Sequence, residues 1–211
     1  YTQLRLGWHW DDDYKSEQFF ELLDDNIHGM GLEYLIHAQY AEGRQKYLAQ
    51  LKMDRIWFSY ITARISAHHN RLERSVYNGQ GKIIDMRRER RTGFEISLGQ
   101  QVKRFGTVRG ALILDEVRSR SDVARSVEKF SQRILQMESV IETFDNLPFP
   151  NTGKKLQAEI RFAGKFLGGD VEYTRFFSSL EGYFPIGKYI NFHPKASLGL
   201  SGSILPPTEQ F

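Results

Sequence analysis

The chain alternates apolar and polar residues over about ten positions at a time, and this pattern recurs about eleven times between turns or charged loops. In the first segment, one face would carry Leu4, Leu6, Trp8 and Trp10, and the other Gln3, Arg5, Gly7 and His9. Only an extended strand sorts neighbouring side chains onto opposite faces in this way. The pattern therefore predicts an all-β fold, an antiparallel transmembrane β-barrel with an apolar outer wall and a polar interior.

The low hydropathy of the chain does not contradict this prediction. Mean hydropathy is -0.49, and charged residues make up 26% of the sequence. No run approaches about eighteen apolar residues, which excludes a membrane protein built of spanning helices. A barrel strand needs only about nine to eleven residues, of which every second one is apolar, so such strands leave average hydropathy low.

Cysteine content and charge remove several further classes. The 211 residues include no cysteine, which excludes disulfides, thiol nucleophiles and cysteine-ligated metals. The formal net charge is +3, and the charges are interspersed rather than collected in blocks. We therefore expect no nucleic-acid partner.

About eleven strands are predicted. They centre on residues 3–10, 19–23, 32–40, 46–53, 61–68, 94–99, 108–117, 135–142, 156–162, 171–184 and 189–203. Pro194 falls inside the last of them and predicts a bulge or local break, because proline has no N–H to donate to a neighbouring strand.

The connections between the predicted strands favour a bacterial barrel over a soluble sandwich, which also alternates. The even-numbered connections are tight, whereas the odd-numbered ones include the two longest, at 69–88 and 118–133. Bacterial barrels place short turns on the periplasmic side and longer loops outside. Helical spacing of apolar residues after Asp122 predicts a short helix in the second long loop. Aromatic residues near strand ends would form interfacial girdles: Trp8, Trp10, Trp57, Phe58, Phe105, Phe144, Phe149 and Tyr183.

Charged residues on the polar side of the strands are candidates to line a water-filled lumen, where charges of mixed sign can pair. These candidates are Arg64, Glu95, Arg109, Glu138, Glu159, Arg161, Arg175, Glu181 and Lys195.

We expect no catalytic, cofactor-binding or metal-binding residue in this chain. The nearest approach to a Gly-x-Ser-x-Gly nucleophile elbow lies at 199–203, where small residues at the end of a strand are the simpler interpretation. His68 and His69 are adjacent, so in a strand they would point to opposite faces and could not share one ion. A solvated pair at the edge of a loop is predicted instead.

Several specific motifs in the last third of the chain resemble the bacterial surface antigen superfamily of outer-membrane β-barrels. They read TFDNLPFPNTG at 143–153, GGDVEYTR at 168–175, YFPI at 183–186 and LPPTEQF at 205–211. That superfamily includes the barrel-assembly insertase, the two-partner-secretion transporters, and patatin-like phospholipases that carry such a barrel at their C-terminus. The resemblance implies localisation in the outer membrane of a Gram-negative-type bacterium.

The resemblance also implies a barrel of sixteen strands. In the family, a loop after the eleventh strand folds inward and carries an Arg-Gly-Tyr/Phe tip. Because the strand pattern here ends at the first residues of that loop, we expect residues 1–211 to be an incomplete outer-membrane barrel domain, with upstream periplasmic domains and the C-terminal strands missing. Arg161, Arg175 and Glu181 are candidates to contact the inward loop.

Within the superfamily, residues 4–14 and the turn at 25–31 look most like barrels fused to patatin domains. The expected function is to anchor or translocate an N-terminal patatin-like domain, and any lipase activity would then lie upstream of this chain. Two alternatives stay open: an insertase or translocase barrel for assembly or secretion of other proteins, and a porin-like channel. The lipid bilayer is the expected partner; other outer-membrane or periplasmic proteins, or a second copy of the chain, stay open.

Overall fold

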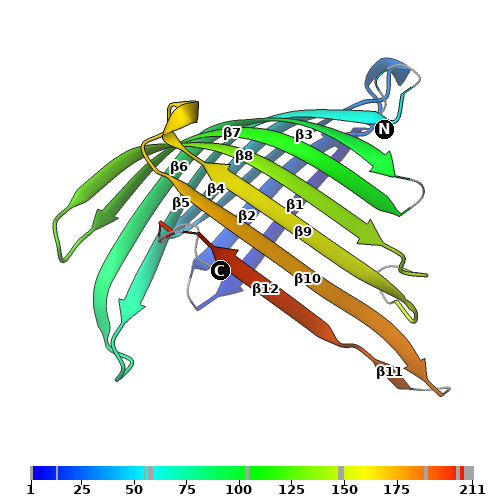
Figure 1. Ribbon diagram of the computed structural model, residues 1–211. Coiled ribbons are helices and arrows are strands. Elements are labelled where there is room, and N and C mark those ends of the chain that lie inside the picture. The colour runs from blue at the N-terminus through cyan, green and yellow to red at the C-terminus, as the bar shows by residue number, and fades with distance from the viewer. Residues whose placement is uncertain are drawn as a thin grey trace.

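In a computed structural model the chain forms a single curved antiparallel sheet (Figure 1). The structure describes residues 2–12, 14–54, 56, 59–102, 105–146, 150–187, 190–202 and 205–206, with the backbone alone at Asp11 and His28. The predicted girdle residues Trp57, Phe58 and Phe149 lie outside the described residues, as does most of the motif at 205–211. No helix in the described part of the chain is long and apolar enough to cross a membrane.

Twelve strands make up the sheet. They are β1 (Thr2–Asp11), β2 (Lys15–Asp24), β3 (Leu32–Ala41), β4 (Arg44–Met53), β5 (Ile61–Tyr77), β6 (Ile83–Val102), β7 (Gly106–Ser121), β8 (Val127–Glu142), β9 (Gly153–Ala163), β10 (Tyr173–Ile186), β11 (Ile190–Phe192) and β12 (Lys195–Ser201). Two short 3-10 helices, η1 (Ile27–Gly29) and η2 (Lys165–Leu167), lie in connections. The all-β antiparallel fold is thus as predicted.

Each strand from β1 to β10 pairs with its sequence neighbours, and both β11 and β12 pair with β10. Eleven strands were predicted, and the count differs because the last one is divided at His193 and Pro194, as the proline predicted. The carbonyl of Pro194 still accepts a hydrogen bond from the Gly182 N–H at 3.1 Å, so β10 is paired across the break. Among the described residues, β1 pairs only with β2 and β12 only with β10, so the sheet has two edges.

Alternation in the sequence becomes a continuous apolar face in the structure. One register row crosses seven strands and consists of Tyr34, Leu51, Ile65, Ile96, Leu112, Leu135 and Phe162. Ile65 and Leu135 are 46% and 43% exposed although they lie in the middle of the sheet. In water such a face would be unfavourable, whereas the acyl chains of a bilayer cover it at no cost. The row is therefore the convex, lipid-facing side.

Two predicted connections are wrong. Residues assigned to the loop at 69–88 mostly extend β5 and β6, which turn only at 78–82, and residues assigned to 118–133 extend β7 and β8. The predicted helix after Asp122 is also wrong, because β8 begins at Val127. Figure 1 shows both hairpins projecting beyond the neighbouring strands. The asymmetry of a bacterial barrel is present, but strand extensions carry it rather than long loops.

Ion pairs between strands explain why these charged segments stay extended. Arg88 donates to Asp122 at 3.2 Å and contacts Glu73 at 3.3 Å, which links β5, β6 and the turn after β7. Asp85 accepts hydrogen bonds from the Ser121 hydroxyl at 2.8 Å and the Val123 N–H at 3.1 Å. Cross-strand pairs of this kind stabilise a sheet without apolar alternation, so hydrophobic periodicity misses them.

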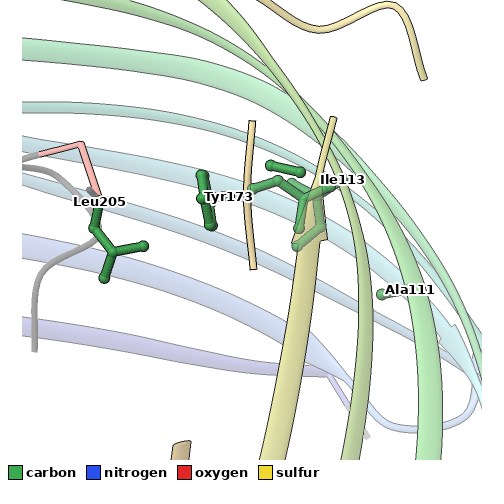
Figure 2. Packing of buried hydrophobic residues seen from close by; sticks show 6 residues of the cluster. Ala111, Ile113, Tyr173 and Leu205 are labelled. Atoms are coloured by element: carbon green, nitrogen blue, oxygen red, sulfur yellow. The ribbon is translucent and has the colours of Figure 1, made fainter. Parts of the chain in front are cut away.

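The concave face carries a small apolar cluster beneath the polar residues. It consists of Ala111, Ile113, Ile134, Ala163, Tyr173 and Leu205, all buried (Figure 2). Leu205 follows β12 in the chain yet belongs to this cluster, so this residue lies on the concave side.

The predicted aromatic girdle is correct only in part. Trp8, Trp10 and Phe105 are exposed near strand ends. Tyr183, however, lies on the same face of β10 as Glu181, where its ring stacks on His193 at 4.0 Å and meets Phe144 edge-on at 5.4 Å. Gly153, opposite Tyr183 in register, lets the backbone of Phe144 come close, because a Cβ there would lie 2.8 Å from Phe144 Cα. Tyr183 is therefore an inner-face residue and no part of a lipid-facing girdle.

The connection between β9 and β10 is attached to β8 by one carboxylate. Asp170 accepts hydrogen bonds from the backbone N–H of Ser131 at 2.7 Å and from the Ser131 hydroxyl at 2.8 Å. These bonds favour the ionised form, and the Ser131 backbone N–H is the main reason that the pKa of Asp170 lies below its ordinary value.

The two faces of β4 give a first prediction. Leu51→Arg puts a charge on the lipid-facing row and should lower the free energy of unfolding by about 2 to 4 kcal/mol. Gln50→Arg, the adjacent position, faces an open polar hollow whose lining includes two acids and three arginines. Because water can solvate a charge there, this variant should change the free energy of unfolding by less than about 1 kcal/mol. Guanidinium unfolding of the full-length protein in lipid vesicles measures both. Equal destabilisation by the two variants would contradict the assignment of faces.

A second prediction concerns acid. The pKa of Asp170 is lower in the folded than in the unfolded protein, so its stabilisation is complete above the ordinary value and is lost as pH falls through the lowered one. The melting temperature of wild type should therefore exceed that of Asp170→Asn at pH 6, and the difference should narrow as the pH falls below the ordinary value of 3.8. Asp12→Asn, which removes a carboxylate from another turn, is the control for a general effect of removing one charge. A difference between wild type and Asp170→Asn that did not narrow in acid would refute the role of the ionised carboxylate.

Candidate functional site

All nine charged residues singled out in the sequence lie on one face of the sheet, opposite the lipid-facing row. Strand register shows this directly, because cross-strand partners share a face. Arg64, Arg161 and Arg175 belong to a single row that continues through Ser97, Ala111 and Gln136. That the face lines a water-filled lumen stays a prediction.

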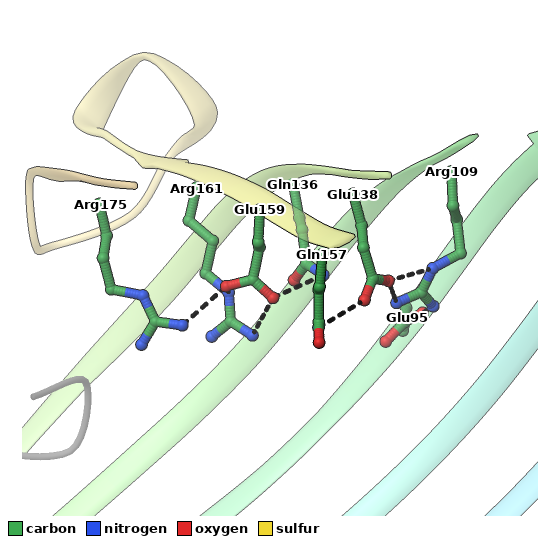
Figure 3. Close-up of polar contacts among 8 residues, drawn as sticks. All are labelled: Glu95, Arg109, Gln136, Glu138, Gln157, Glu159, Arg161 and Arg175. Atoms are coloured by element: carbon green, nitrogen blue, oxygen red, sulfur yellow. Dashed lines mark hydrogen bonds and ion pairs between the residues drawn. The ribbon is translucent and has the colours of Figure 1, made fainter. Parts of the chain in front are cut away.

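The first group of these residues centres on Arg109 of β7. Its guanidinium donates to Glu95 of β6 at 2.8 Å and to Glu138 of β8 at 2.7 and 3.1 Å (Figure 3). The Gln157 amide of β9 donates to the other oxygen of Glu138 at 3.2 Å. One arginine therefore joins three adjacent strands and is extended to a fourth by a glutamine.

The second group centres on Glu159 of β9, which is only 9% exposed. Arg175 of β10 donates to Glu159 at 2.7 Å, and Arg161 lies 2.9 Å from the same carboxylate. The Gln136 amide of β8 donates to it at 3.3 Å. Glu159 therefore compensates two guanidiniums at once, as Figure 3 shows.

The two groups are contiguous, because Glu138 and Glu159 are cross-strand partners. Like charges directly opposite one another destabilise a sheet unless each is compensated. Here Arg109 forms an ion pair with Glu138, and Arg161 and Arg175 form ion pairs with Glu159. The result is a charge-balanced band across five strands, which we call the inner ion-pair band: Glu95, Arg109, Glu138, Glu159, Arg161 and Arg175.

Arg64 of β5 lies beside this band without joining it. Its Nε is buried and has no hydrogen-bond partner among the described residues. It lines two hollows on the concave face, one of about 480 Å³ shared with Arg109 and Glu138, and one of about 310 Å³ shared with Glu95 and Arg161. The structure thus brings Arg64 near the band and leaves open space around it.

Glu181 and Lys195 share the face but not the band. They are cross-strand partners near the other end of β10. Glu181 lies 2.8 Å from His193 Nε2, just before the proline that divides the last strand. Sequence reasoning therefore found nine residues of one face, of which six form a connected group.

A buried acid was missed in the sequence. Asp115 of β7 is 1% exposed, lies 3.1 Å from His68 Nε2 and 3.6 Å from Arg91. A Cβ at Gly93, its cross-strand partner, would overlap the Asp115 carboxylate, so only glycine leaves room there. One sequence signal could have indicated it. Asp115 lies an even number of residues from Arg109 in β7 and therefore shares its face.

The two adjacent histidines are therefore not a solvated pair at a loop edge. Both lie inside β5, because the predicted loop is strand. They do point to opposite faces as predicted: His68 approaches Asp115 on the concave side, whereas His69 is 2.7 Å from the Thr92 hydroxyl on the other. In the described part of the chain, no group of three or more His, Cys, Asp or Glu is placed to hold a metal ion.

The arrangement is suited to structure and recognition rather than to bond making. Its acids and bases neutralise one another in place, and the hollows are open on the concave side. Such a surface can hold strands in register and can bind a polar segment laid across it. Leu205, beyond the last strand, already lies on this side.

Comparison with known proteins agrees with the geometry. The family model described as an Omp85 superfamily domain matches residues 26–211. The chain belongs to the Omp85 superfamily. A solved structure with the same fold is "The crystal structure of BamA from Haemophilus ducreyi lacking POTRA domains 1-3", with a TM-score of 0.82 and 12% sequence identity over 96% of this chain. No curated protein matches in sequence.

Membership in the Omp85 superfamily confirms the resemblance that the motifs indicated, and it places the chain in the outer membrane of a Gram-negative-type bacterium. It also identifies the open curved sheet as part of a barrel wall. The chain spans 41% of the length of the matched structure. Neither comparison shows a fused patatin-like domain, which stays a prediction.

The inner ion-pair band of this Omp85 chain gives a third prediction. Glu159→Gln leaves two guanidiniums without their carboxylate, and the free energy of unfolding should fall by about 3 kcal/mol. Glu142→Gln removes a half-exposed partner of Lys155, 3.0 Å away, and should cost less than about 1 kcal/mol. The measurement is equilibrium unfolding in vesicles. If Glu159→Gln were as mild as Glu142→Gln, the band would not hold the wall together.

Proposed function

We propose that this chain is part of an outer-membrane barrel that inserts or translocates other proteins. The observation that carries the proposal is the Omp85 superfamily match over residues 26–211, supported by the fold shared with the BamA barrel. The superfamily contains barrel-assembly insertases and two-partner-secretion transporters. An insertase or translocase fits these findings better than an anchor for a fused domain.

The edges of the described sheet, at β1 and β12, need strand partners in a membrane. In hydrocarbon, each unpaired N–H or C=O costs several kcal/mol, by order of magnitude. Further strands of the same polypeptide or strands of another chain can supply these partners.

The concave face supports a barrel whose interior is occupied. We propose that the nine charged residues line this interior, with Arg161, Arg175 and Glu181 facing the inward loop. Two hollows beside Arg64, of about 480 and 310 Å³, lie on this face and leave room for a loop laid across the charged side chains. An occupied interior disfavours the porin-like channel, which needs an unobstructed lumen.

The anchor for a patatin-like domain and the insertase are distinguished mainly by the domains expected upstream of this chain. Its support is the likeness of residues 4–14 and of the turn at 25–31 to barrels fused to patatin domains. A Gly-x-Ser-x-Gly domain upstream, followed by one periplasmic domain, would favour the anchor. Several tandem periplasmic transport-associated domains would favour the insertase.

The test is depletion of the natural full-length protein in its own cell, followed by pulse labelling of other outer-membrane barrels. We expect the heat-modifiable, folded fraction of newly made barrels, or the export of a secreted partner, to fall several-fold. Wild type and Glu142→Gln should restore it. Unchanged folding and export would refute the proposal: large ion conductance of the purified barrel would then favour a channel, and loss of one fused domain from the surface would favour the anchor.

A further inference from the structure

A row of positive side chains crosses the convex face beyond the apolar, lipid-facing side chains. Four residues are successive cross-strand partners in this row: Arg71 of β5, Arg90 of β6, Arg118 of β7 and Lys129 of β8. They share the face of the row formed by Ala67, Phe94, Leu114 and Arg133, because each lies four residues along its strand from that row. We call these four residues the basic row.

Most of the basic row is uncompensated. Arg71 pairs with Glu73 at 2.6 Å, and the nearby Arg88 and Arg133 pair with Asp122 at 3.2 Å and Glu116 at 2.8 Å. Arg90, Arg118 and Lys129 are exposed, and no carboxylate lies within 4.0 Å of their charged nitrogens among the residues that the structure describes. Adjacent like charges on paired strands destabilise a sheet, so the arrangement favours an added anion.

A hollow among the residues of the basic row offers space for a ligand on the convex face. A hollow of about 410 Å³ lies among Arg71, Arg88, Arg90, Arg118 and Arg120, and Glu89 and Val127 complete its lining. The acid in this lining, Glu89, is already paired: it lies 3.9 Å from Arg91, whose side chain belongs to the concave face. The hollow is therefore a strongly positive depression on the outside of the wall.

The depth of the row identifies the chemistry that would meet it. Arg90 lies four residues beyond Phe94, which is about 13 Å along the strand and roughly 10 Å along the membrane normal after strand tilt. The headgroup layer extends about 5 to 7 Å beyond the hydrocarbon, so the long side chain of Arg90 can reach back into it from that level. The row lies on the extended hairpins β5–β6 and β7–β8, and such extensions project from the outer surface of a bacterial barrel.

We propose that the basic row binds the phosphate groups of a phosphorylated glycolipid in the outer leaflet of the membrane. The acyl chains of that lipid would cover the apolar rows containing Phe94 and Ile96, and its phosphates would lie over Arg90, Arg118 and Lys129. Guanidiniums hold phosphate oxygens in paired hydrogen bonds. The inference goes beyond the proposed function, because it concerns the outer wall and requires no inserted partner.

The experiment is lipid binding by the full-length protein purified in detergent, titrated with bis-phosphorylated lipid A and with the same lipid after removal of both phosphates. The triple variant Arg90→Gln, Arg118→Gln, Lys129→Gln should bind the phosphorylated lipid about tenfold more weakly than wild type, as expected for three exposed charge contacts. The control Arg74→Gln, Arg87→Gln, Lys82→Gln also removes two arginines and one lysine, all of them from the β5–β6 hairpin and outside the basic row, and should stay within about twofold.

A second measurement separates binding from folding. Without lipid, the triple variant should melt at the same temperature as wild type or higher, because it loses like-charge repulsion. Phosphorylated lipid should raise the melting temperature of wild type and of the control but not that of the triple variant. Neither readout depends on insertion activity, so failure here leaves the proposed function untouched.

Three results would overturn the inference. The first is equal affinity of wild type for the phosphorylated and dephosphorylated lipids. The second is unchanged binding by the triple variant. The third is equal or tighter binding of a soluble polyphosphate without acyl chains, which would identify a site for free anions instead of a membrane lipid.

Discussion

The requirement that every backbone N–H and C=O be paired inside a membrane governs this structure. Hydrocarbon offers no hydrogen-bond partner, so the chain crosses as strands that satisfy one another. Consecutive strands are antiparallel neighbours from β1 to β10, and the two segments after them both pair with β10. Even the proline that divides the last strand keeps its carbonyl bonded to Gly182. The two sides of the sheet are then free to meet lipid and polar surroundings separately.

The two faces solve opposite electrostatic problems. The concave face buries acids and bases, so it compensates them internally: Arg109 joins two glutamates, and Glu159 joins two arginines. On the convex face, cations such as Arg90 have no acidic partner among the described residues where the apolar wall ends. A membrane supplies phosphate at that level and none at the centre of the wall. The difference between the faces thus follows the composition of the bilayer at each depth.

Alternation located the strands well where one face meets lipid, as in β3, β4 and β9. It failed where β5 to β8 continue beyond the membrane, because those segments carry charge on both faces and no apolar period marks them. Helical spacing after Asp122 misled for the same reason: Ile134 belongs to a buried inner cluster rather than to a helix. Asp115 was missed because its role depends on Gly93 of another strand, which no local pattern connects to it.

The sequence by itself determined the class of fold, the lipid-facing side and the parity of all nine charged candidates, because side-chain alternation is a local property of an extended chain. Its motifs also indicated the superfamily. Only the tertiary structure decided which charges meet, because register between strands joins residues such as Glu95 and Arg109, or Arg71 and Arg90, that no local period relates. Inter-strand hydrogen bonding set the lengths of the hairpins and brought four separate cations into one row.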